Sequence, residues 1–409
     1  MKKIYDHSSS LSEKVCRQCL YPESHPLGLV IGEDGVCSGC KVHQEKYDIN
    51  WDQRLQALKL KAEQIKAASR GKHDCVVYVD SDAESFYVVY LIKKVLGLEP
   101  LLVNFNDQFR TDIGYKNLHT LQTHFDCDML SFTMRPSLYK GVIRESFFKY
   151  RNILWPALAA RSALPVKVAT QRGISTIVWG GHQGMEQVGM FSHHDYIEMS
   201  RWYRNEHDLF GLSESLICSP TAAFEERDLD MLSYPSDDTL IEGDIKGVYL
   251  NNYFLWDPLK QNKDMIAEGY TPEWTASTFD YFERSGSSVY YQIHDLLKIY
   301  KHGYAKVTDH LCREIRHERV SRAEAVDINE YYLKKKRDYS EFFQWLGLSE
   351  RGLQWLEQWV LSVDDGQKTA GLKLPGALQS FCNDSVVPSE RYLVFDKGIY
   401  LQSQVSGSL

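Results

Sequence analysis

The fold can be predicted outward from one segment, Asp74-Cys75-Val76-Val77-Tyr78-Val79-Asp80-Ser81-Asp82-Ala83-Glu84-Ser85. Its first half is apolar and rich in β-branched residues, which predicts a strand over 74–79. Its second half is polar and leads into residues 86–96, where apolar side chains recur at helical spacing. The segment therefore predicts a strand, a loop and a helix. A loop between a first strand and a helix N-terminus is a common place to bind phosphate.

The same alternation continues along the chain to about residue 230. Apolar runs that predict strands lie at 100–105, 129–132 and 175–179. Helical patterns lie at 115–124, 139–150 and 157–171. Strands that alternate with helices at this spacing predict an α/β fold with a doubly wound parallel sheet. In such a sheet, ligands bind at the carboxyl ends of the strands.

Composition divides the chain into three parts joined by a connector. Residues 1–50 are loop-rich and contain paired cysteines, and residues 51–70 form a charged helical connector. Residues 71–230 are the α/β domain, and residues 231–401 are predicted to be mainly helical. Helical patterns in that last part lie at 290–302, 322–332 and 340–346. The polar tail from 402 to 409 is predicted to be disordered.

Four cysteines near the N-terminus have metal-ligand spacing. Cys16, Cys19, Cys37 and Cys40 form the pattern C-x2-C-x17-C-x2-C. Two such pairs predict a zinc ribbon with a tetrahedral Zn²⁺, and four cysteines leave no open position, so the ion would be structural. Two disulfides, a redox pair or an iron–sulfur centre are the alternatives. The other five cysteines are expected to be free thiols. They are Cys75, Cys127, Cys218, Cys312 and Cys382.

Charge and hydropathy exclude several classes of protein. The chain has 409 residues, of which 43% are hydrophobic and 25% charged, and its formal net charge is −8. This acidic balance argues against a broad nucleic-acid surface. The N-terminus carries no apolar segment of the secretory type, and no stretch approaches the ~18 apolar residues of a membrane helix. We therefore expect a cytoplasmic protein that neither binds nucleic acid nor inserts into a membrane.

The chain resembles the N-acetyl sugar amidotransferases, a branch of the Rossmann-like PP-loop ATP pyrophosphatase superfamily. Two Cys-x-x-Cys pairs followed by a strand and the loop at 80–85 carry the resemblance. So do short blocks that keep the family's order along the chain. They are 98–106, 113–118, 164–165, 178–180, 190–192, 204–211, 253–257, 301–305 and 321–325.

The resemblance implies amidine formation on a nucleotide-activated N-acetyl sugar. ATP with Mg²⁺ would adenylate the acetamido oxygen and release pyrophosphate, and ammonia would then displace AMP. A glutaminase and a cyclase-like partner protein would supply the ammonia. The acetamidino sugar would enter a bacterial surface polysaccharide such as the O-antigen of lipopolysaccharide (LPS).

The loop at 80–85 departs from the family pattern Ser-Gly-Gly-Lys-Asp-Ser. Asp80 replaces the first serine and Ala83 the lysine, and only Ser85 is kept. Ser81 and Asp82 replace the glycines, and Glu84 the aspartate. Residues with a Cβ resist the backbone angles that turn N–H groups onto a pyrophosphate. A carboxylate ~4 Å from a phosphate costs on the order of 4 kcal/mol at an effective dielectric of ~20.

Three interpretations of this loop stay open. The protein has lost ATP hydrolysis and is a non-catalytic scaffold or regulatory subunit, or it keeps an amidotransferase reaction with a remodelled activation step. In the third, Asp80, Asp82 and Glu84 bind a divalent cation that bridges to phosphate. The leading function is the N-acetyl sugar amidotransferase, and the non-catalytic relative is the alternative. A nucleic-acid modifying enzyme is a weaker third.

Other candidate site residues follow the sheet. Gly180 and Gly181 come after the strand at 175–179 and either lie near the nucleotide or form a tight turn. Arg204, His207 and Asp208 are predicted to line the substrate pocket, because arginine binds phosphate well. His194 and Glu198 would share a helix face, as a partial metal site or as a solvated salt-bridged face. A basic stretch could reach a diphosphate: Lys301, Arg313, Arg316, Arg319 and Arg322.

Overall fold

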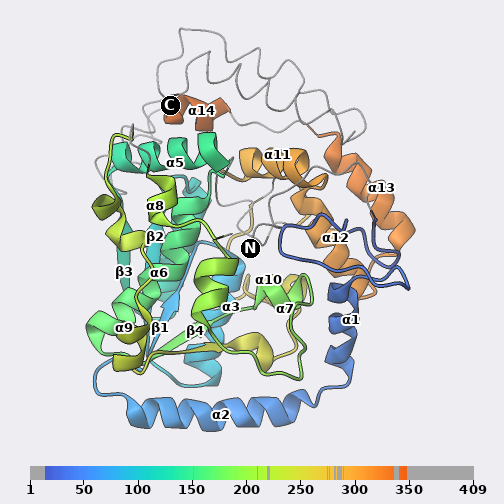
Figure 1. Ribbon diagram of the computed structural model, residues 1–409. Helices are drawn as coiled ribbons and strands as arrows, with labels where there is room; N and C mark the ends of the chain where they lie inside the picture. The colour runs from blue at the N-terminus through green and yellow to red at the C-terminus, as the bar shows by residue number, and fades with distance from the viewer. Residues whose placement is uncertain are drawn as a thin grey trace.

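A computed structural model describes residues 14–347 of the chain, except 151, 210, 219–221, 274, 276, 281, 283–287, 289 and 336–339. A parallel sheet with helices on both faces forms one side of the molecule (Figure 1). The N-terminal segment and helices α12 (Lys306–Arg316) and α13 (Arg322–Leu333) form the other side, and helix α2 (Trp51–Ala68) runs beneath both (Figure 1). The predicted disordered tail and Cys382 lie outside the described residues.

The sheet has five strands in the order β3-β2-β1-β4-β5, and every neighbouring pair is parallel. The strands are β1 (Cys75–Tyr78), β2 (Pro100–Asn106), β3 (Asp128–Thr133), β4 (Thr176–Trp179) and β5 (Lys246–Tyr249). Val76 on β1 pairs with Leu101 on one side and with Ile177 on the other. The strand order reverses between β1 and β4, so the topological switch point lies there.

The strands alternate between two cores. Val76, Leu101 and Ile177 pack into a core with the helices α5 (Pro136–Tyr150) and α6 (Trp155–Arg172). Val77 and Val178 face the opposite core, which contains α2, α3 and α4. Because side chains on a strand alternate between its two faces, one strand serves both cores. This confirms the predicted α/β class with a parallel sheet.

Two helices connect strands across the second core. Helix α3 (Ala83–Tyr90) continues as the π-helical segment η2 (Leu91–Val95), and α4 (Asp112–His124) follows β2. The Asp82 side chain caps α3 by accepting from the Ser85 N–H, and Thr111 caps α4 in the same way. Side-chain caps of this kind satisfy N–H groups that have no partner within the helix.

Strand β5 was missed by the sequence analysis, which placed no strand after residue 230. It extends the sheet beyond β4, with Trp179 opposite Tyr249. Its apolar run is short, and short helices rather than one long amphipathic helix precede it. The elements between β4 and β5 are α7 (Gln183–Glu186), η3 (Trp202–His207), α8 (Glu214–Ile217), η4 (Glu226–Leu232) and α9 (Asp237–Glu242).

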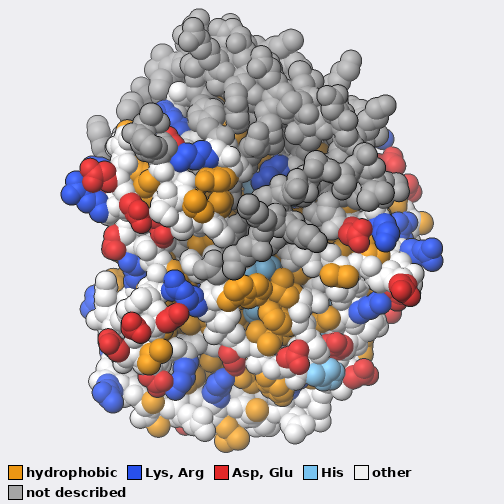
Figure 2. Space-filling view, viewed as in Figure 1, with side chains coloured by type: hydrophobic (Ala, Val, Ile, Leu, Met, Phe, Trp, Pro, Cys, Tyr) orange, Lys and Arg blue, Asp and Glu red, His pale blue; other side chains and the backbone are white. Residues whose placement is uncertain are grey.

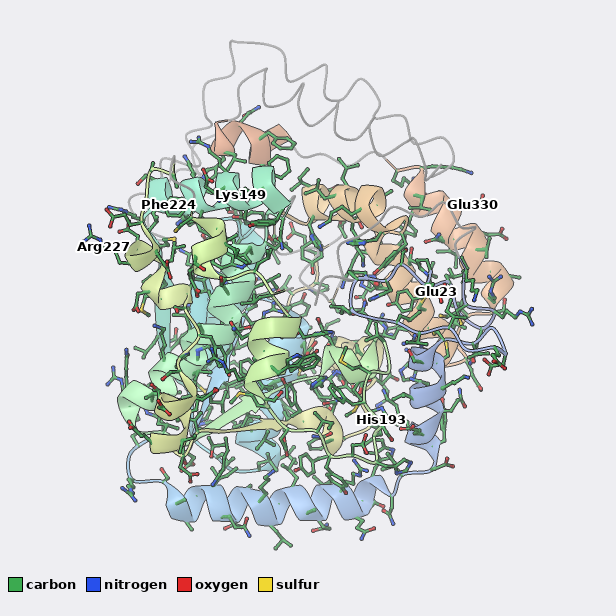
Figure 3. The ribbon with its side chains drawn as sticks, viewed as in Figure 1. Glu23, Lys149, His193, Phe224, Arg227 and Glu330 are labelled. Carbon is green, nitrogen blue, oxygen red and sulfur yellow. The ribbon has the colours of Figure 1, made fainter. Side chains whose placement is uncertain are left out.

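The N-terminal lobe, which we define as residues 14–47, is tied to the rest of the chain by α2 (Trp51–Ala68). The lobe ends in α1 (Ser38–Gln44) and η1 (Glu45–Tyr47). From α2, Arg54 donates to the carbonyl oxygens of His193, labelled in Figure 3, and Asn252, each at 2.8 Å. The predicted connector is thus a helix fixed to the polar segment after β4.

Beyond β5, the described part of the chain consists mainly of helices. After η5 (Leu250–Asn252), its helices are α10 (Pro258–Asp264), α11 (Tyr290–His302), α12 (Lys306–Arg316), α13 (Arg322–Leu333) and α14 (Ser340–Leu346). Helix α12 does not form a separate domain, because its apolar residues share one core with the N-terminal lobe. Leu311 and Cys312 pack there with Tyr21 and Leu29.

On the face drawn in Figure 2, acidic and basic side chains are interspersed over the described surface. Among the described residues, no helix combines the length and the apolar character needed to cross a bilayer.

Candidate functional site

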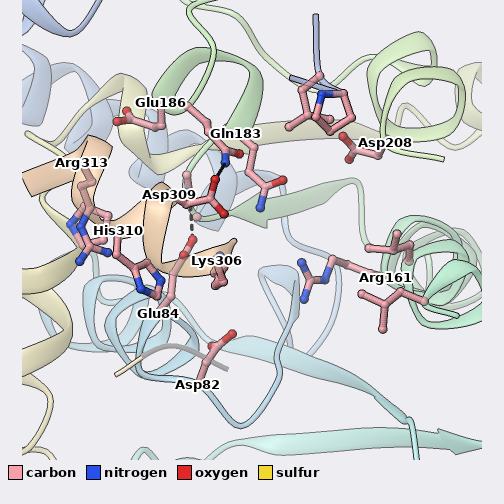
Figure 4. Close-up of a pocket in the computed structure, with 18 of the residues that line it drawn as sticks. Asp82, Glu84, Arg161, Gln183, Glu186, Asp208, Lys306, Asp309, His310 and Arg313 are labelled. Atoms are coloured by element: carbon pink, nitrogen blue, oxygen red, sulfur yellow. Dashed lines mark hydrogen bonds between the residues drawn. The ribbon is translucent and has the colours of Figure 1, made fainter. Parts of the chain in front are cut away.

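A cavity of about 480 Å³ opens at the carboxyl ends of β1 and β4. The loop at 80–85 and the residues after β4 form one wall, and α6 contributes Arg161. Helices α11 and α12 form the opposite wall, and the N-terminal lobe contributes Tyr21, His25 and Lys46. Figure 4 shows Lys306, Asp309, His310 and Arg313 of α12 across the cavity from Arg161. The cavity lies at the switch point of the sheet, at the carboxyl ends of the strands where the sequence analysis expected a site.

The first loop residue, Asp80, is an internal anion. It is 2% exposed, and its two carboxylate oxygens each accept from a guanidinium group. Arg110 Nη2 lies 3.0 Å from Oδ1, and Arg161 Nη2 lies 2.9 Å from Oδ2. Arg110 comes from the loop after β2 and is also buried, whereas the Arg161 side chain is 30% exposed and lines the cavity. Neither arginine was predicted, since each is distant from the loop in sequence.

Three N–H groups of the loop at 80–85 are bonded within the protein. Asp80 N donates to Ser85 Oγ at 2.9 Å, Ser85 N donates to Asp82 Oδ1 at 2.9 Å, and Ala83 N donates to the Phe282 carbonyl at 3.1 Å. Residues 80–85 adopt ordinary backbone angles without a positive φ. A phosphate-binding loop instead turns such N–H groups toward its ligand. The loop therefore does not fit the phosphates of ATP.

The three loop carboxylates do not form a cation site. Asp80 binds two arginines, Asp82 caps α3, and Glu84 Oε1 accepts from the Gly181 N–H at 3.1 Å. Burial and the charge of Asp80 raise the pKa of Asp82. Among the described residues, the four clustered cysteines are the side chains that lie close enough together to hold a metal ion, and the loop carboxylates do not belong to such a group. The hypothesis of a divalent cation held by the loop thus gains no support.

Gly180 and Gly181 pack closely against the loop and against Trp256. A Cβ on Gly180 would lie 2.5 Å from Glu84 Oε1, and one on Gly181 would lie 2.7 Å from Trp256 Nε1. Both glycines line the cavity, and neither has a positive φ. They are required here by close packing at the switch point, because any larger residue would push Glu84 or Trp256 aside.

Of the predicted pocket residues, the structure brings Arg204 and Asp208 into the cavity wall. Arg204 Nη1 lies 3.1 Å from Asp208 Oδ2, as expected for residues four apart. The guanidinium group of Arg204 stacks on Trp179, 3.8 Å from the ring centre. Arg204 is 6% exposed, and its Nε and Nη2 atoms are buried without a hydrogen-bond partner. This is an arginine that could donate to a bound oxygen atom.

His207 lies outside the cavity lining. Its ring stacks on Tyr203, and its Nε2 lies 3.4 Å from the Leu27 carbonyl oxygen. His194 and Glu198 do not share a helix, because residues 193–199 are irregular. Glu198 Oε1 instead accepts from Lys61 Nζ at 2.8 Å and from the Tyr253 hydroxyl at 2.9 Å. None of these three residues lines the cavity, and the contacts of His207 and Glu198 are with other parts of the protein.

The four predicted metal ligands converge in the N-terminal lobe. The Sγ atoms of Cys16, Cys19, Cys37 and Cys40 lie within 4.8 Å of one another, and all four residues are fully buried. Cys19 Sγ and Cys37 Sγ are 3.7 Å apart, far beyond the ~2.05 Å of a disulfide. Zn–S bonds of about 2.3 Å place tetrahedral sulfur atoms about 3.8 Å apart. The cluster can therefore hold a metal ion such as zinc.

Arg316 of α12 is the cation beside this cluster. Its Nε lies 3.4 Å from Cys40 Sγ, and its Nη2 lies 3.6 Å from Cys37 Sγ. Its Nη1 donates to the carbonyl oxygens of Glu186 and Gln187, so it also joins the cluster to the segment after β4. Burial works to lower the pKa of Arg316, but the charged thiolates overcome it and hold the pKa well above its usual value.

The α11–α12 wall is rich in cations that have acidic partners. The described lining residues of this wall include five Lys or Arg and one Asp, whereas the sheet side contributes five carboxylates and two arginines. On the wall, Lys298 forms an ion pair with Asp309. Burial works to raise the pKa of Asp309, but Lys298 and Lys306 overcome it and lower it to about 2.

The predicted basic stretch is divided between the cavity and the protein interior. Lys301, Arg313 and Arg316 line the cavity, whereas the other two arginines are engaged elsewhere. Arg319 binds Asp257 and Glu314, and Arg322 donates to the Cys19 carbonyl oxygen.

The sequence analysis also missed a buried ion pair that connects the N-terminal lobe to the segment after β4. Lys46 Nζ of the N-terminal lobe lies 2.5 Å from Glu186 Oε2 and donates to the Trp256 carbonyl oxygen at 2.9 Å. Burial works to raise the pKa of Glu186, but Lys46 and His193 lower it below its usual value. A lysine and a glutamate 140 residues apart give no local signal of pairing.

One family model matches part of the chain. It is described as the C-terminal domain of LPS biosynthesis proteins of the WbpG-like type, and it matches residues 276–360. The matched segment contains α11, α12, α13 and α14, and thus the basic wall of the cavity and Arg316. A search of curated proteins finds no match. The match links this part of the chain to proteins of LPS biosynthesis.

Proposed function

From the match to LPS biosynthesis proteins, we propose that the chain acts in bacterial LPS or O-antigen biosynthesis as a relative of the N-acetyl sugar amidotransferases. Its cavity would bind a nucleotide-activated N-acetyl sugar, and the chain itself would not activate that sugar with ATP. The observation that carries this proposal is the loop at 80–85, in which three N–H groups are bonded to Ser85, Asp82 and Phe282 instead of facing a ligand.

The cavity suits a ligand with a polar anionic part and a flat or apolar part. Its volume of about 480 Å³ lies within the usual range of ~300–1,000 Å³ for small-molecule sites. Arg204 offers buried donor nitrogens, and Trp256 offers an aromatic surface beside Gly181. Arginine binds phosphate oxygens strongly, and an aromatic ring suits the apolar face of a sugar.

Calorimetric titration of the purified chain tests this proposal. UDP-N-acetylglucosamine, used as a probe of the ligand class, is expected to bind saturably, whereas ATP with Mg²⁺ is expected to give no binding heat. Arg204→Lys keeps the charge beside Asp208 but loses the planar fork, so affinity should fall about tenfold or more. Lys260→Met, at an exposed site outside the cavity, is the control and should leave affinity unchanged. Tight ATP binding would contradict the proposal.

Amidine formation is the second candidate, and the position of the cavity favours it. Arg204 and Asp208 face a cavity at the switch point of a parallel sheet, where the family's reaction would take place. In the family's reaction, as the resemblance implies it, the acetamido C=O becomes C=NH, ammonia supplies the nitrogen, the oxygen leaves with AMP, and ATP gives up pyrophosphate. Because the loop at 80–85 does not fit the phosphates of ATP, this candidate requires a remodelled activation step. A glutaminase and a cyclase-like protein would supply the ammonia.

A product assay separates the two candidates. The chain is incubated with the sugar nucleotide, ATP, Mg²⁺ and an ammonium salt, which replaces the ammonia-supplying partners. Mass spectrometry then looks for exchange of one oxygen for one NH on the sugar, and a coupled assay follows pyrophosphate. Formation of both products would establish the amidotransferase. Sugar-nucleotide binding without either product would support the non-catalytic relative.

A further inference from the structure

We propose that Asp80 is a built-in anion that fills an oxyanion site formed by Arg110 and Arg161. The site would accept a phosphate-class oxyanion if the carboxylate were removed. The proposal concerns this chain's own loop and does not depend on the identity of the sugar ligand. The loop lacks the glycines of a phosphate-binding loop, and in addition the Asp80 carboxylate occupies the place that a phosphate would take beside β1.

The geometry is that of an anion site already occupied. The Asp80 carboxylate lies between two guanidinium groups from different elements, at 3.0 Å and 2.9 Å. Arg110 is further fixed by its contacts with the Phe105 carbonyl oxygen at 3.0 Å and with Asn106 Oδ1 at 3.4 Å. The guanidinium of Arg110 is therefore held in place from the β2 side, while Arg161 approaches along the cavity wall from α6.

The place of this site in the fold is informative. Asp80 comes two residues after β1 and three residues before α3 begins at Ala83, so it stands at the phosphate position of a strand–loop–helix unit. Two arginines that converge on one point at the switch point are a typical arrangement for binding phosphate or carboxylate groups. A carboxylate from the chain itself satisfies them here.

The surrounding loop carries its own acceptors in the same way. At the start of α3, Asp82 Oδ1 accepts hydrogen bonds from the Ser85 N–H and from the Ser85 hydroxyl, the latter at 2.6 Å. Glu84 accepts a hydrogen bond from the N–H of Gly181. The Ser85 N–H, the Ser85 hydroxyl and the Gly181 N–H are thus each bonded to a carboxylate of the loop. Asp80 differs from the other two because its carboxylate lies between two guanidinium groups, so its removal leaves two positive charges without their shared counter-ion.

The test is chemical rescue of Asp80→Ala by added anions. The variant leaves two arginines without their shared carboxylate, and its melting temperature should fall by on the order of 5 °C. Millimolar pyrophosphate should restore most of that loss, and potassium chloride at equal ionic strength should not. Calorimetry should detect in the variant a pyrophosphate site that depends on Arg161 and that the wild-type protein lacks.

Matched variants make the rescue specific. Because phosphate-type salts stabilise folded proteins in general, the effect is measured as the difference from the wild-type protein. Asp280→Ala removes another fully buried carboxylate, one that accepts from Arg313 at 2.6 Å, and should show no rescue by pyrophosphate. The double variant Asp80→Ala with Arg161→Ala should lose the rescue, because one half of the site is gone.

Two outcomes would overturn the proposal. One is Asp80→Ala behaving like Asp280→Ala in every salt. The other is wild-type protein that binds pyrophosphate and loses it in Arg161→Ala, since Asp80 would then leave the site open. If Asp80→Ala fails to fold, Asp80→Asn removes the charge at nearly the same shape, and the same comparison applies to it. The titration of wild-type protein requires no variant to fold.

Discussion

Arg316 and Cys40 join the two ends of the described chain: the arginine Nε on α12 lies 3.4 Å from the cysteine Sγ in the N-terminal lobe. The same guanidinium contacts Cys37 Sγ and two carbonyl oxygens after β4, and it lines the cavity. Four thiolates around a divalent ion carry a net charge of −2, and a buried arginine offsets part of it. The cysteine cluster therefore connects the N-terminal lobe to α12 and to the segment after β4.

Arg316→Lys should weaken metal binding. A lysine cannot contact both sulfur atoms and both carbonyl oxygens at once, and loss of partners around metal ligands costs roughly 10–100-fold in affinity. Zinc release to a chromogenic chelator should accordingly be about tenfold faster. Arg322→Lys is the matched control, because Arg322 contacts the Cys19 carbonyl oxygen and not a sulfur atom. Equal release rates for the two variants would contradict the role given to Arg316.

Metal analysis of the purified chain should give about one zinc per chain, and Cys37→Ser should remove it. Loss of the ion should also loosen α12, since Leu311 and Cys312 share a core with the cluster. Hydrogen exchange of the residues in α12 reports this directly. The prediction would be contradicted if the purified protein contained no metal, had four free thiols in the cluster and still showed full protection of α12 from hydrogen exchange. The cluster would then fold without an ion.

Stability should fall as the pH is lowered below about 6.5, in part because of His25. Burial lowers the pKa of His25 to about 3, from an unfolded value near 6.5. Between these values the unfolded chain binds a proton that the folded chain does not, so each pH unit costs about 1.4 kcal/mol of the free energy of unfolding. Burial lowers the pKa of His294, also to about 3, and that of His317 to about 4, in the same direction.

Melting temperatures between pH 7 and pH 5 check this dependence. His25→Gln keeps an acceptor for the Leu27 N–H, which lies 3.2 Å from His25 Nδ1, but it cannot take up the proton. The decline should be shallower in this variant than in the wild-type protein. The exposed residue His119 supplies the control, and His119→Gln should reproduce the wild-type slope. A slope that is the same in both variants would exclude His25 as a contributor.

Glu186→Gln should be strongly destabilising, by about 3 kcal/mol, because it leaves the buried Lys46 charge without its carboxylate. Replacing both residues with apolar ones, in Lys46→Met with Glu186→Leu, should cost less than the single change. Urea unfolding of the wild-type protein, Lys46→Met, Glu186→Leu and the variant that carries both changes forms a double-mutant cycle. Additive effects in this cycle would mean that the pair is not coupled. The exposed pair of Lys72 and Asp128 provides a comparison with small expected effects.

The carboxylate of Asp82 should act as a helix cap. Asp82→Ala should lower stability by about 1 kcal/mol, and Asp82→Asn, which keeps an acceptor for the Ser85 N–H, should lower it much less. Thermal unfolding measures both. Equal losses in the two variants would instead point to the negative charge rather than the hydrogen bond.

The sequence by itself determined the local features. The apolar run at 74–79, the helix after it and the later alternation predicted the parallel sheet, because periodicity and turn residues act over a few residues. The spacing of Cys16, Cys19, Cys37 and Cys40 predicted a cluster, and the four sulfur atoms do converge. Zinc as the ion and the PP-loop superfamily stay predictions, and the LPS assignment gains the match at 276–360.

Tertiary structure decided what the charged residues do. The sequence placed Asp80 in a loop where it would repel a phosphate, but it could not show that Arg110 and Arg161 bind that carboxylate, because both partners lie far along the chain. The same holds for Arg316, whose partner Cys40 lies in the N-terminal lobe, and for Lys46, whose partner Glu186 follows β4. Charge pairs form between elements that only the packed fold brings together. A single sequence therefore gives the residue types at this site without their partners.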